Sequence, residues 1–153
     1  MMKPWMVLGA ICLATAALAD EAAKPAKKKA PVMMTAADMK WADMSAKGVQ
    51  SATLWGDMSK GAFGALIRFS AGTSMPLHTH SSELKLVVIS GTLYVGADAA
   101  SAKDLGPGSY ALQPAGWKHV TGCRAGADCL FFTEGNGKFD MKPVGGPAPE
   151  TTK

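Results

Sequence analysis

The amino-acid sequence predicts a single all-β domain. Its 153 residues suffice for one compact hydrophobic core but not comfortably for two. After residue 37 the chain is a series of short apolar runs separated by Gly, Pro, Ser and Asp, and none of these runs keeps helical periodicity over three turns. The predicted strands are 52–56, 62–70, 84–90, 92–96, 109–113, 118–123 and 129–135.

The third of these strands indicates how the strands are layered. In an extended segment Leu84 and Leu86 point to one face, and Val87 and Ile89 point to the other. Apolar residues on both faces are typical of a strand that is covered on both sides, which predicts a sandwich of two sheets. Ahead of the first strand, residues 38–44 fit either a short helical turn or an edge strand.

The two ends of the chain differ from the domain between them. Residues 1–19 have the basic start, apolar run and small-x-small end of a signal peptide, so we expect a periplasmic or secreted protein. The apolar run is too short for a stable membrane anchor. Residues 20–37 have the Ala/Pro/Lys composition of a disordered tether. The folded domain is expected over 38–141, followed by a disordered Gly/Pro tail over 142–153.

The formal net charge of +4 does not indicate nucleic-acid binding. Four of the lysines lie in the predicted tether, between residues 24 and 29. From residue 32 onward the chain has 11 Lys and Arg against 10 Asp and Glu, so the folded part is nearly neutral. A nucleic-acid-binding domain is expected to carry a basic stripe, and this composition provides none.

Two cysteines remain once the signal peptide is set aside. Cys123 and Cys129 flank five residues that favour a loop, so they are placed to face each other across a hairpin. In an oxidising compartment we expect them to form a disulfide. The spacing alone does not fix the geometry that such a bond requires.

The three histidines are the strongest chemical signal in the chain. His78 and His80 are two residues apart, so on an extended strand both imidazoles point to the same face. Such a pair can meet one metal ion, although an isolated His-x-His is more often a chance pair on a polar edge. The remaining histidine, His119, follows a second glycine-punctuated segment, and this favours a metal site built from all three.

Two motifs around these histidines resemble those of the cupin superfamily. The first is Gly, five residues, His-x-His and a later Gly, at Gly72, His78, His80 and Gly91. The second is Gly, five residues, Pro-x-Gly, two residues and His, at Gly108, Pro114, Gly116 and His119. The chain resembles a family of small single-domain cupins of unknown function, which is similar to ChrR-type cupins.

This resemblance implies a small jelly-roll β-barrel with His78, His80 and His119 lining its interior. They would hold a divalent metal ion such as Zn, Fe, Mn, Ni or Cu. The resemblance also implies a small-molecule ligand or substrate and a homodimer.

The sequence departs from the family pattern at two positions. The pattern places a glutamate ligand four residues after the second histidine, where this chain has Leu84. Glu83 is one residue early, and strand alternation turns it to the opposite face unless a bulge intervenes. An asparagine is often found at the position of Cys123. We therefore expect a three-histidine site with Glu83 on its rim.

Aromatic residues are interpreted mainly as core. Trp117 is the exception, because alternation puts it on the same face as His119, where it would form a pocket wall. Tyr94 and Tyr110 could reach the cavity but are expected to pack. The residues assigned to the core are Trp55, Phe63, Phe69, Phe131 and Phe132.

Two functions remain open from the sequence, beside a third possibility, a vestigial site that holds no metal. One is a metal-dependent oxygenase or isomerase acting on a small molecule, because three neutral imidazoles leave coordination positions open. The other is a module that binds or senses a metal or small ligand without turnover. No residue is assigned as a general acid or base, and the fold alone does not separate the two.

Overall fold

The computed structural model describes residues 30–145. The chain divides into two units, residues 1–33 and 34–153, and the β structure lies in the second. The predicted signal peptide, residues 20–29 of the predicted tether and residues 146–153 of the predicted tail lie outside the described residues. Within the described part, no helix has the length and apolar character needed to cross a membrane.

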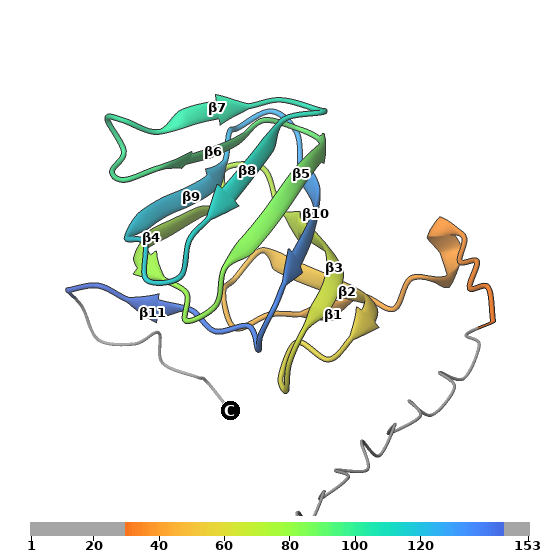
Figure 1. The fold of residues 1–153 in the computed structure, drawn as a ribbon. Coiled ribbons are helices and arrows are strands. Elements are labelled where there is room, and N and C mark those ends of the chain that lie inside the picture. Colours follow the sequence, from red (N-terminus) through yellow and green to blue (C-terminus); the bar gives the residue numbers. More distant parts are fainter. Residues whose placement is uncertain (1–29, 146–153) are drawn as a thin grey trace, which may run out of the picture. The chain divides into compact units, whose positions relative to one another are not determined.

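The second unit is built from two antiparallel sheets, which confirms the predicted all-β sandwich (Figure 1). The six-stranded sheet has the order β1-β2-β3-β10-β5-β8, and the five-stranded sheet has the order β11-β4-β9-β6-β7. The strands are β1 (Ala42–Asp43), β2 (Val49–Gly56), β3 (Phe63–Phe69), β4 (Ser74–Thr79), β5 (Leu84–Ser90), β6 (Leu93–Gly96), β7 (Lys103–Leu105), β8 (Tyr110–Gln113), β9 (His119–Cys123), β10 (Cys129–Gly135) and β11 (Lys142–Pro143).

Most predicted strands agree with the observed ones, and β5 and β10 agree at both ends. The segment 38–44, which the sequence left open, contains the edge strand β1, and one 3-10 turn, η1 (Ala36–Asp38), precedes it. That turn falls at the end of the stretch that the sequence assigned to the tether. Three strands are absent from the predicted set. Strand β4 was treated as extended only around its histidines, and the short strands β7 and β11 have no apolar run.

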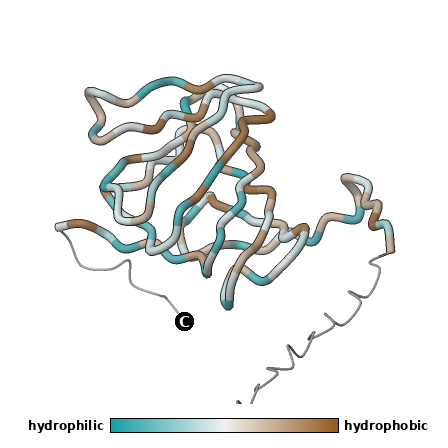
Figure 2. The backbone as a smooth tube through the Cα atoms, in the orientation of Figure 1, coloured by the Kyte–Doolittle hydropathy of each residue, from teal (hydrophilic) through white to brown (hydrophobic). Residues whose placement is uncertain are grey.

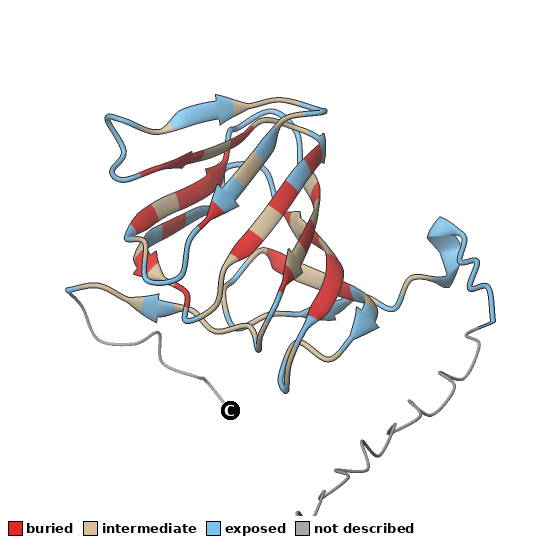
Figure 3. Cartoon of the chain, viewed as in Figure 1, coloured by how far each residue is buried: buried red, intermediate tan, exposed pale blue. Residues whose placement is uncertain are grey.

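The hydrophobic core lies between the sheets (Figure 3). In β10, buried and half-buried residues alternate along the whole strand, so one face of the strand points into the core. Phe69 and Phe131, on neighbouring strands, pack edge to face with ring centroids 5.4 Å apart. Phe63 is fully buried, as predicted for these three phenylalanines.

The prediction that β5 is covered on both faces is wrong. Figure 2 shows that β5 is hydrophobic along much of its length, but Val87 and Ile89 are 40% and 46% exposed. The six-stranded sheet has a core on one side only, so side chains on its other face meet solvent.

Trp55 is also exposed rather than in the core, and its ring covers the backbone of Gly64 on that outer face. Phe132 is only half-buried.

The predicted disulfide is present, but it does not close a hairpin. Cys123 ends β9 in the five-stranded sheet, and Cys129 begins β10 in the six-stranded sheet. Strand β9 pairs with β4 and β6, whereas β10 pairs with β3 and β5. The bond therefore connects the two sheets where the chain crosses from one to the other.

The C-terminal boundary also differs from the prediction. Lys142 and Pro143, assigned to a disordered tail, form β11 and pair with Thr79 and His78 of β4. The backbone N–H of Val144 donates to the carbonyl of Leu77, 2.9 Å away. Composition missed this strand because the pairing uses the unpaired backbone edge of β4 rather than apolar side chains.

Candidate metal centre

Strands β4 and β9 bring two of the histidines together. His78 and His119 are direct partners in this antiparallel pair, and both are buried. Side chains at such positions lie on the same face of the sheet and in contact. Their ring centroids are 4.3 Å apart. The proximity of these residues, 41 positions apart in the sequence, is thus a result of strand register.

His80 lies just beyond the end of β4 and completes the cluster. Its ring centroid is 5.0 Å from that of His78 and 5.2 Å from that of His119. Its Nδ1 is hydrogen-bonded to the backbone carbonyl of Asp140. The Asp140 carboxylate in turn accepts hydrogen bonds from the backbone N–H and the hydroxyl of Ser81, at 2.7 and 2.6 Å. The segment before β11 therefore holds His80 in place.

The three rings share one hydrogen-bonding pattern. The Nδ1 of His78 contacts the carbonyl of Pro76 at 2.7 Å, and the Nδ1 of His119 contacts the carbonyl of Trp117 at 2.9 Å. A carbonyl only accepts, so each Nδ1, including that of His80, carries the proton and donates it. In a neutral ring the lone pair is then on Nε2.

Burial keeps these imidazoles neutral. Burial lowers the pKa of His78 and of His80, against the opposing effect of their backbone hydrogen bonds. Burial also lowers the pKa of His119 to about 4. All three rings are therefore in the neutral form that binds metal ions at neutral pH.

The donor set fits a divalent metal ion. One ligand atom from each histidine lies within 4.8 Å of those of the other two. Three nitrogens that share an ion at about 2.0 to 2.1 Å lie roughly 3.4 Å apart in tetrahedral geometry, so small ring movements suffice. The Nε2 of His119 is buried and has no hydrogen-bond partner in the described structure. A buried polar atom without a partner is costly, and a bound ion would satisfy it.

Leu84 and Glu83 face opposite ways, as strand alternation predicts, but Glu83 lies on the outer face of the six-stranded sheet rather than on the rim of the site. Leu84 is buried and faces the cavity beside the histidines. Glu83 points away from the cluster, and its carboxylate lies 3.8 Å from the Nζ of Lys85. No bulge brings that carboxylate inward. Cys123, at the position where the family often has asparagine, is held in the disulfide.

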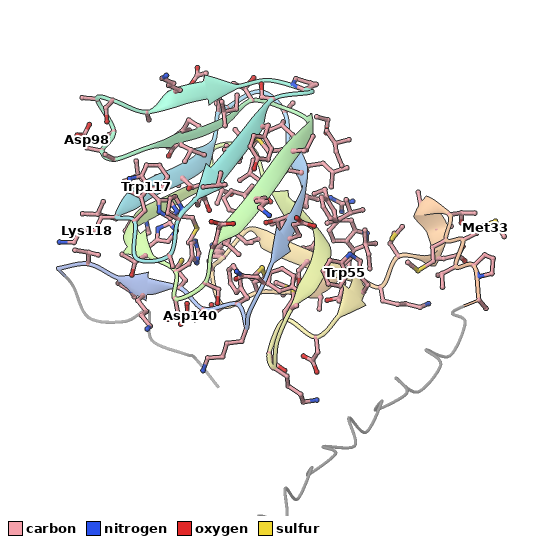
Figure 4. The ribbon with its side chains drawn as sticks, in the orientation of Figure 1. Met33, Trp55, Asp98, Trp117, Lys118 and Asp140 are labelled. Carbon is pink, nitrogen blue, oxygen red and sulfur yellow. A yellow bond between two sulfur atoms is a disulfide. The ribbon has the colours of Figure 1, made fainter. Side chains whose placement is uncertain are left out.

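The cavity that adjoins the histidines lies between the two sheets. His78 and His80 line it. Trp117 stacks on the ring of His119 with centroids 4.8 Å apart and an angle of 15° between the planes. It therefore lies on the same side as His119, as predicted, but it supports that ring rather than lining the cavity. In the view of Figure 4, Trp117 and Asp140 lie to the left of Trp55.

Neither tyrosine lines the cavity, but only Tyr94 packs as predicted. The Tyr94 hydroxyl donates to the Oγ of Ser74, and Tyr110 is 56% exposed.

Sequence reasoning missed three residues of this site. Gln113 and Thr121 line the cavity as buried polar side chains, and Asp140 positions His80. Gln113 is the register partner of Leu84, which is the position that lacks the family glutamate. Knowing this pairing would have pointed to Gln113. The pairing depends on the register between β5 and β8, which the sequence does not specify.

The sandwich of two antiparallel sheets and the buried cluster of histidines from two motifs define the chain as a cupin. Residues 32–148 match the family described as "Domain of unknown function (DUF4437)", so the chain belongs to that family. No curated protein matches the sequence.

Solved structures support the same fold. The polyketide cyclase RemF from Streptomyces resistomycificus has a TM-score of 0.65 and 20% identity, and the alignment covers 78% of this chain and 89% of that one. An RmlC-like cupin from Ralstonia eutropha has a TM-score of 0.59 and 19% identity, over 72% and 71% of the two chains. A chain in the complex of Rhodobacter sphaeroides SigE with the anti-sigma ChrR has a TM-score of 0.53 and 21% identity, over 67% and 51%.

Proposed function

We propose that this cupin binds one divalent metal ion through the Nε2 atoms of His78, His80 and His119 and acts on a small molecule held in the adjoining cavity. The observation that carries the proposal is the hydrogen bond that the three rings have in common: each Nδ1–H is donated to a backbone carbonyl. Hydrogen bonds of this kind are the usual means by which proteins orient metal-binding histidines.

The ligand set favours a reactive rather than a purely structural ion. Structural zinc sites have four protein ligands, whereas this cluster offers three and Leu84 adds none. A divalent ion in this place would act as a Lewis acid on an oxygen atom of the bound molecule. The histidines are neutral and no carboxylate joins them, so the protein would leave the charge of the ion uncompensated. Oxygenase and isomerase chemistry both fit such a site.

A non-catalytic binding or sensing module is the second candidate. It is favoured by the cavity lining, which contains no titratable side chain other than histidine in the described structure. A reaction that needs a separate general acid or base would therefore find none. Incubating the metal-loaded protein with small phenolics, thiols and diketones, and measuring oxygen uptake and product formation, separates the enzyme from the binder.

We also propose that the protein is exported, as its first nineteen residues and its disulfide suggest. An intact mass of periplasmic protein that begins near Asp20 would support export, and one that retains Met1 would contradict it. The homodimer stays a prediction from the resemblance, and analytical ultracentrifugation would test it.

Metal analysis of four purified proteins tests the site. The wild type and Glu83→Ala should each contain about one ion per chain, because Glu83 points away from the cluster. His78→Ala and His119→Ala should lose most of it. Circular dichroism of each variant would show that it is folded. Full metal content after loss of His78 or His119 would refute the site.

A further inference from the structure

The cavity beside the histidines is lined mainly by apolar side chains. Its volume is about 80 Å³, which exceeds the space needed for a single water molecule. The wall formed by the six-stranded sheet consists mainly of Val49, Ile67, Phe69, Leu84, Leu86 and Phe131. Phe139 and two methionines, Met44 and Met141, lie on segments outside the strands and also line the cavity.

No side chain with a permanent charge lines this cavity in the part of the chain that the structure describes. The nearby charged residues are directed elsewhere. Lys85 lies near Glu83 and Glu134 on the outer face of the six-stranded sheet, and Asp140 is engaged by Ser81. A phosphate, carboxylate or ammonium group in the body of a ligand would therefore lose its hydration without gaining a partner. Such a loss is costly.

Among the buried polar side chains of the cavity, Thr121 and Gln113 are the candidates to bind a ligand. The Oγ1 of Thr121 is buried and has no partner in the described structure. Gln113 is only 3% exposed and lines the cavity. Thr133 is different, because its hydroxyl already donates to the backbone carbonyl of Lys85 at 3.0 Å. Gln113 offers both a donor and an acceptor and is the stronger candidate.

We infer that the cavity takes a neutral, largely apolar molecule that carries a hydroxyl or carbonyl oxygen, and that Gln113 is the residue that selects for this oxygen. The inference rests on the proposed function for the role of the histidines. The cavity and its uncharged lining do not depend on a bound ion, so the metal centre and the ligand class can be tested separately.

Four probes that share one aromatic ring test the inference. They are para-methylbenzyl alcohol, its analogue para-ethyltoluene without oxygen, and two alcohols with a remote charge, para-(hydroxymethyl)benzoate and para-(aminomethyl)benzyl alcohol. Binding to the purified full chain is measured by ligand-observed proton NMR, and metal content is measured on the same samples. The neutral alcohol should bind at least about tenfold more tightly than either charged alcohol, because burying an unpaired charge is costly.

The variant Gln113→Leu tests the selecting residue at nearly constant volume. It should weaken binding of the neutral alcohol by roughly three- to tenfold, which corresponds to one hydrogen bond, and leave para-ethyltoluene within about twofold. Thr133→Val is the matched control, because its hydroxyl is already engaged. It should leave the preference for the alcohol unchanged. Thermal unfolding of both variants checks that they are folded.

The outcomes separate the two proposals. Equal binding of the charged and neutral alcohols would overturn the inference whether or not metal is present. An unchanged alcohol preference in Gln113→Leu would overturn the role of Gln113. Protein that contains no metal but binds the neutral alcohol through Gln113 would refute the proposed metal centre and support the cavity inference.

Discussion

The two sheets contribute different chemistry to the same cavity. The five-stranded sheet supplies His78 and His119 as a register pair on β4 and β9. The facing six-stranded sheet supplies leucine, isoleucine, valine and phenylalanine side chains, and its comparable register pair is Leu84 with Gln113. One wall is therefore suited to hold an ion, and the other is suited to hold the apolar body of a ligand.

This division has a physical reason. A metal site needs several donors fixed at short range, and adjacent strands provide this through direct pairing. An apolar wall needs only buried side chains of suitable volume. The comparison predicts that substitutions in the six-stranded wall reduce the stability of the fold, whereas substitutions around the histidines reduce metal affinity.

The largest expected effect is on stability. Leu86 is 3% exposed and lines the six-stranded wall. Leu86→Ala should lower the free energy of unfolding by about 2 to 5 kcal/mol, because it removes buried methyl groups and leaves a cavity. Urea denaturation measures this change. The metal content of the folded protein should remain close to that of the wild type.

His119→Ala should have the opposite effect to Leu86→Ala: the protein should still fold but lose its metal. If Leu86→Ala also lost its metal while folded, or His119→Ala kept it, the division between the two walls would not hold.

The next effect concerns the covalent link between the sheets. Cys123 ends the strand that His119 begins, so the disulfide and the histidine lie at opposite ends of β9. The double variant Cys123→Ser, Cys129→Ser should lose about 2 to 3 kcal/mol of stability, in line with the chain entropy of so short a loop. Its metal affinity should stay within about twofold of the wild type, since the ring contacts are unchanged. A large fall in metal affinity would show that the crossover also positions the histidines.

Much of the fold and the proposed ligands could be predicted from local patterns. Strand alternation correctly placed Leu84 inward and Glu83 outward, and the glycine spacing identified the two histidine segments. Long-range pairing was not accessible in the same way. The sequence does not state that β9 and β10 belong to different sheets, nor that the outer face bearing Val87 has no covering layer.

The contribution of Asp140 was also inaccessible, because it acts through its backbone carbonyl. A carbonyl is present at every residue, so no sequence pattern marks the one that accepts a hydrogen bond from His80. Gln113 is a similar case, since its importance follows from its pairing with Leu84.

Asp140 provides a prediction of intermediate size. Asp140→Ala keeps the carbonyl but removes the carboxylate that binds Ser81, so the segment that holds His80 should loosen. Metal affinity should fall about tenfold, as is typical for residues that support metal ligands. Competition with a chelator of known affinity measures this change.

Asp98→Ala is the matched control for Asp140→Ala. Asp98 also accepts a hydrogen bond from a nearby serine backbone, that of Ser101, but it lies on the β6–β7 connection. Figure 4 shows it well separated from Asp140. Equal losses of metal affinity in the two variants would mean that the carboxylate of Asp140 has no special role.

The smallest expected effect tests the side-chain contact with His119. The Trp117 ring stacks on this imidazole, while the Trp117 backbone carbonyl fixes its Nδ1 proton. Trp117→Ala removes the ring and leaves the carbonyl in place, so the direction of the Nε2 lone pair should persist. Metal affinity should therefore fall only about two- to fivefold, as expected for the loss of one ring-stacking contact. Metal dissociation should be faster because the imidazole becomes exposed to water, and stopped-flow transfer of the ion to a chelator would measure that rate. A loss as large as that of His119→Ala would show that the indole, rather than the backbone hydrogen bond, holds the ligand in position.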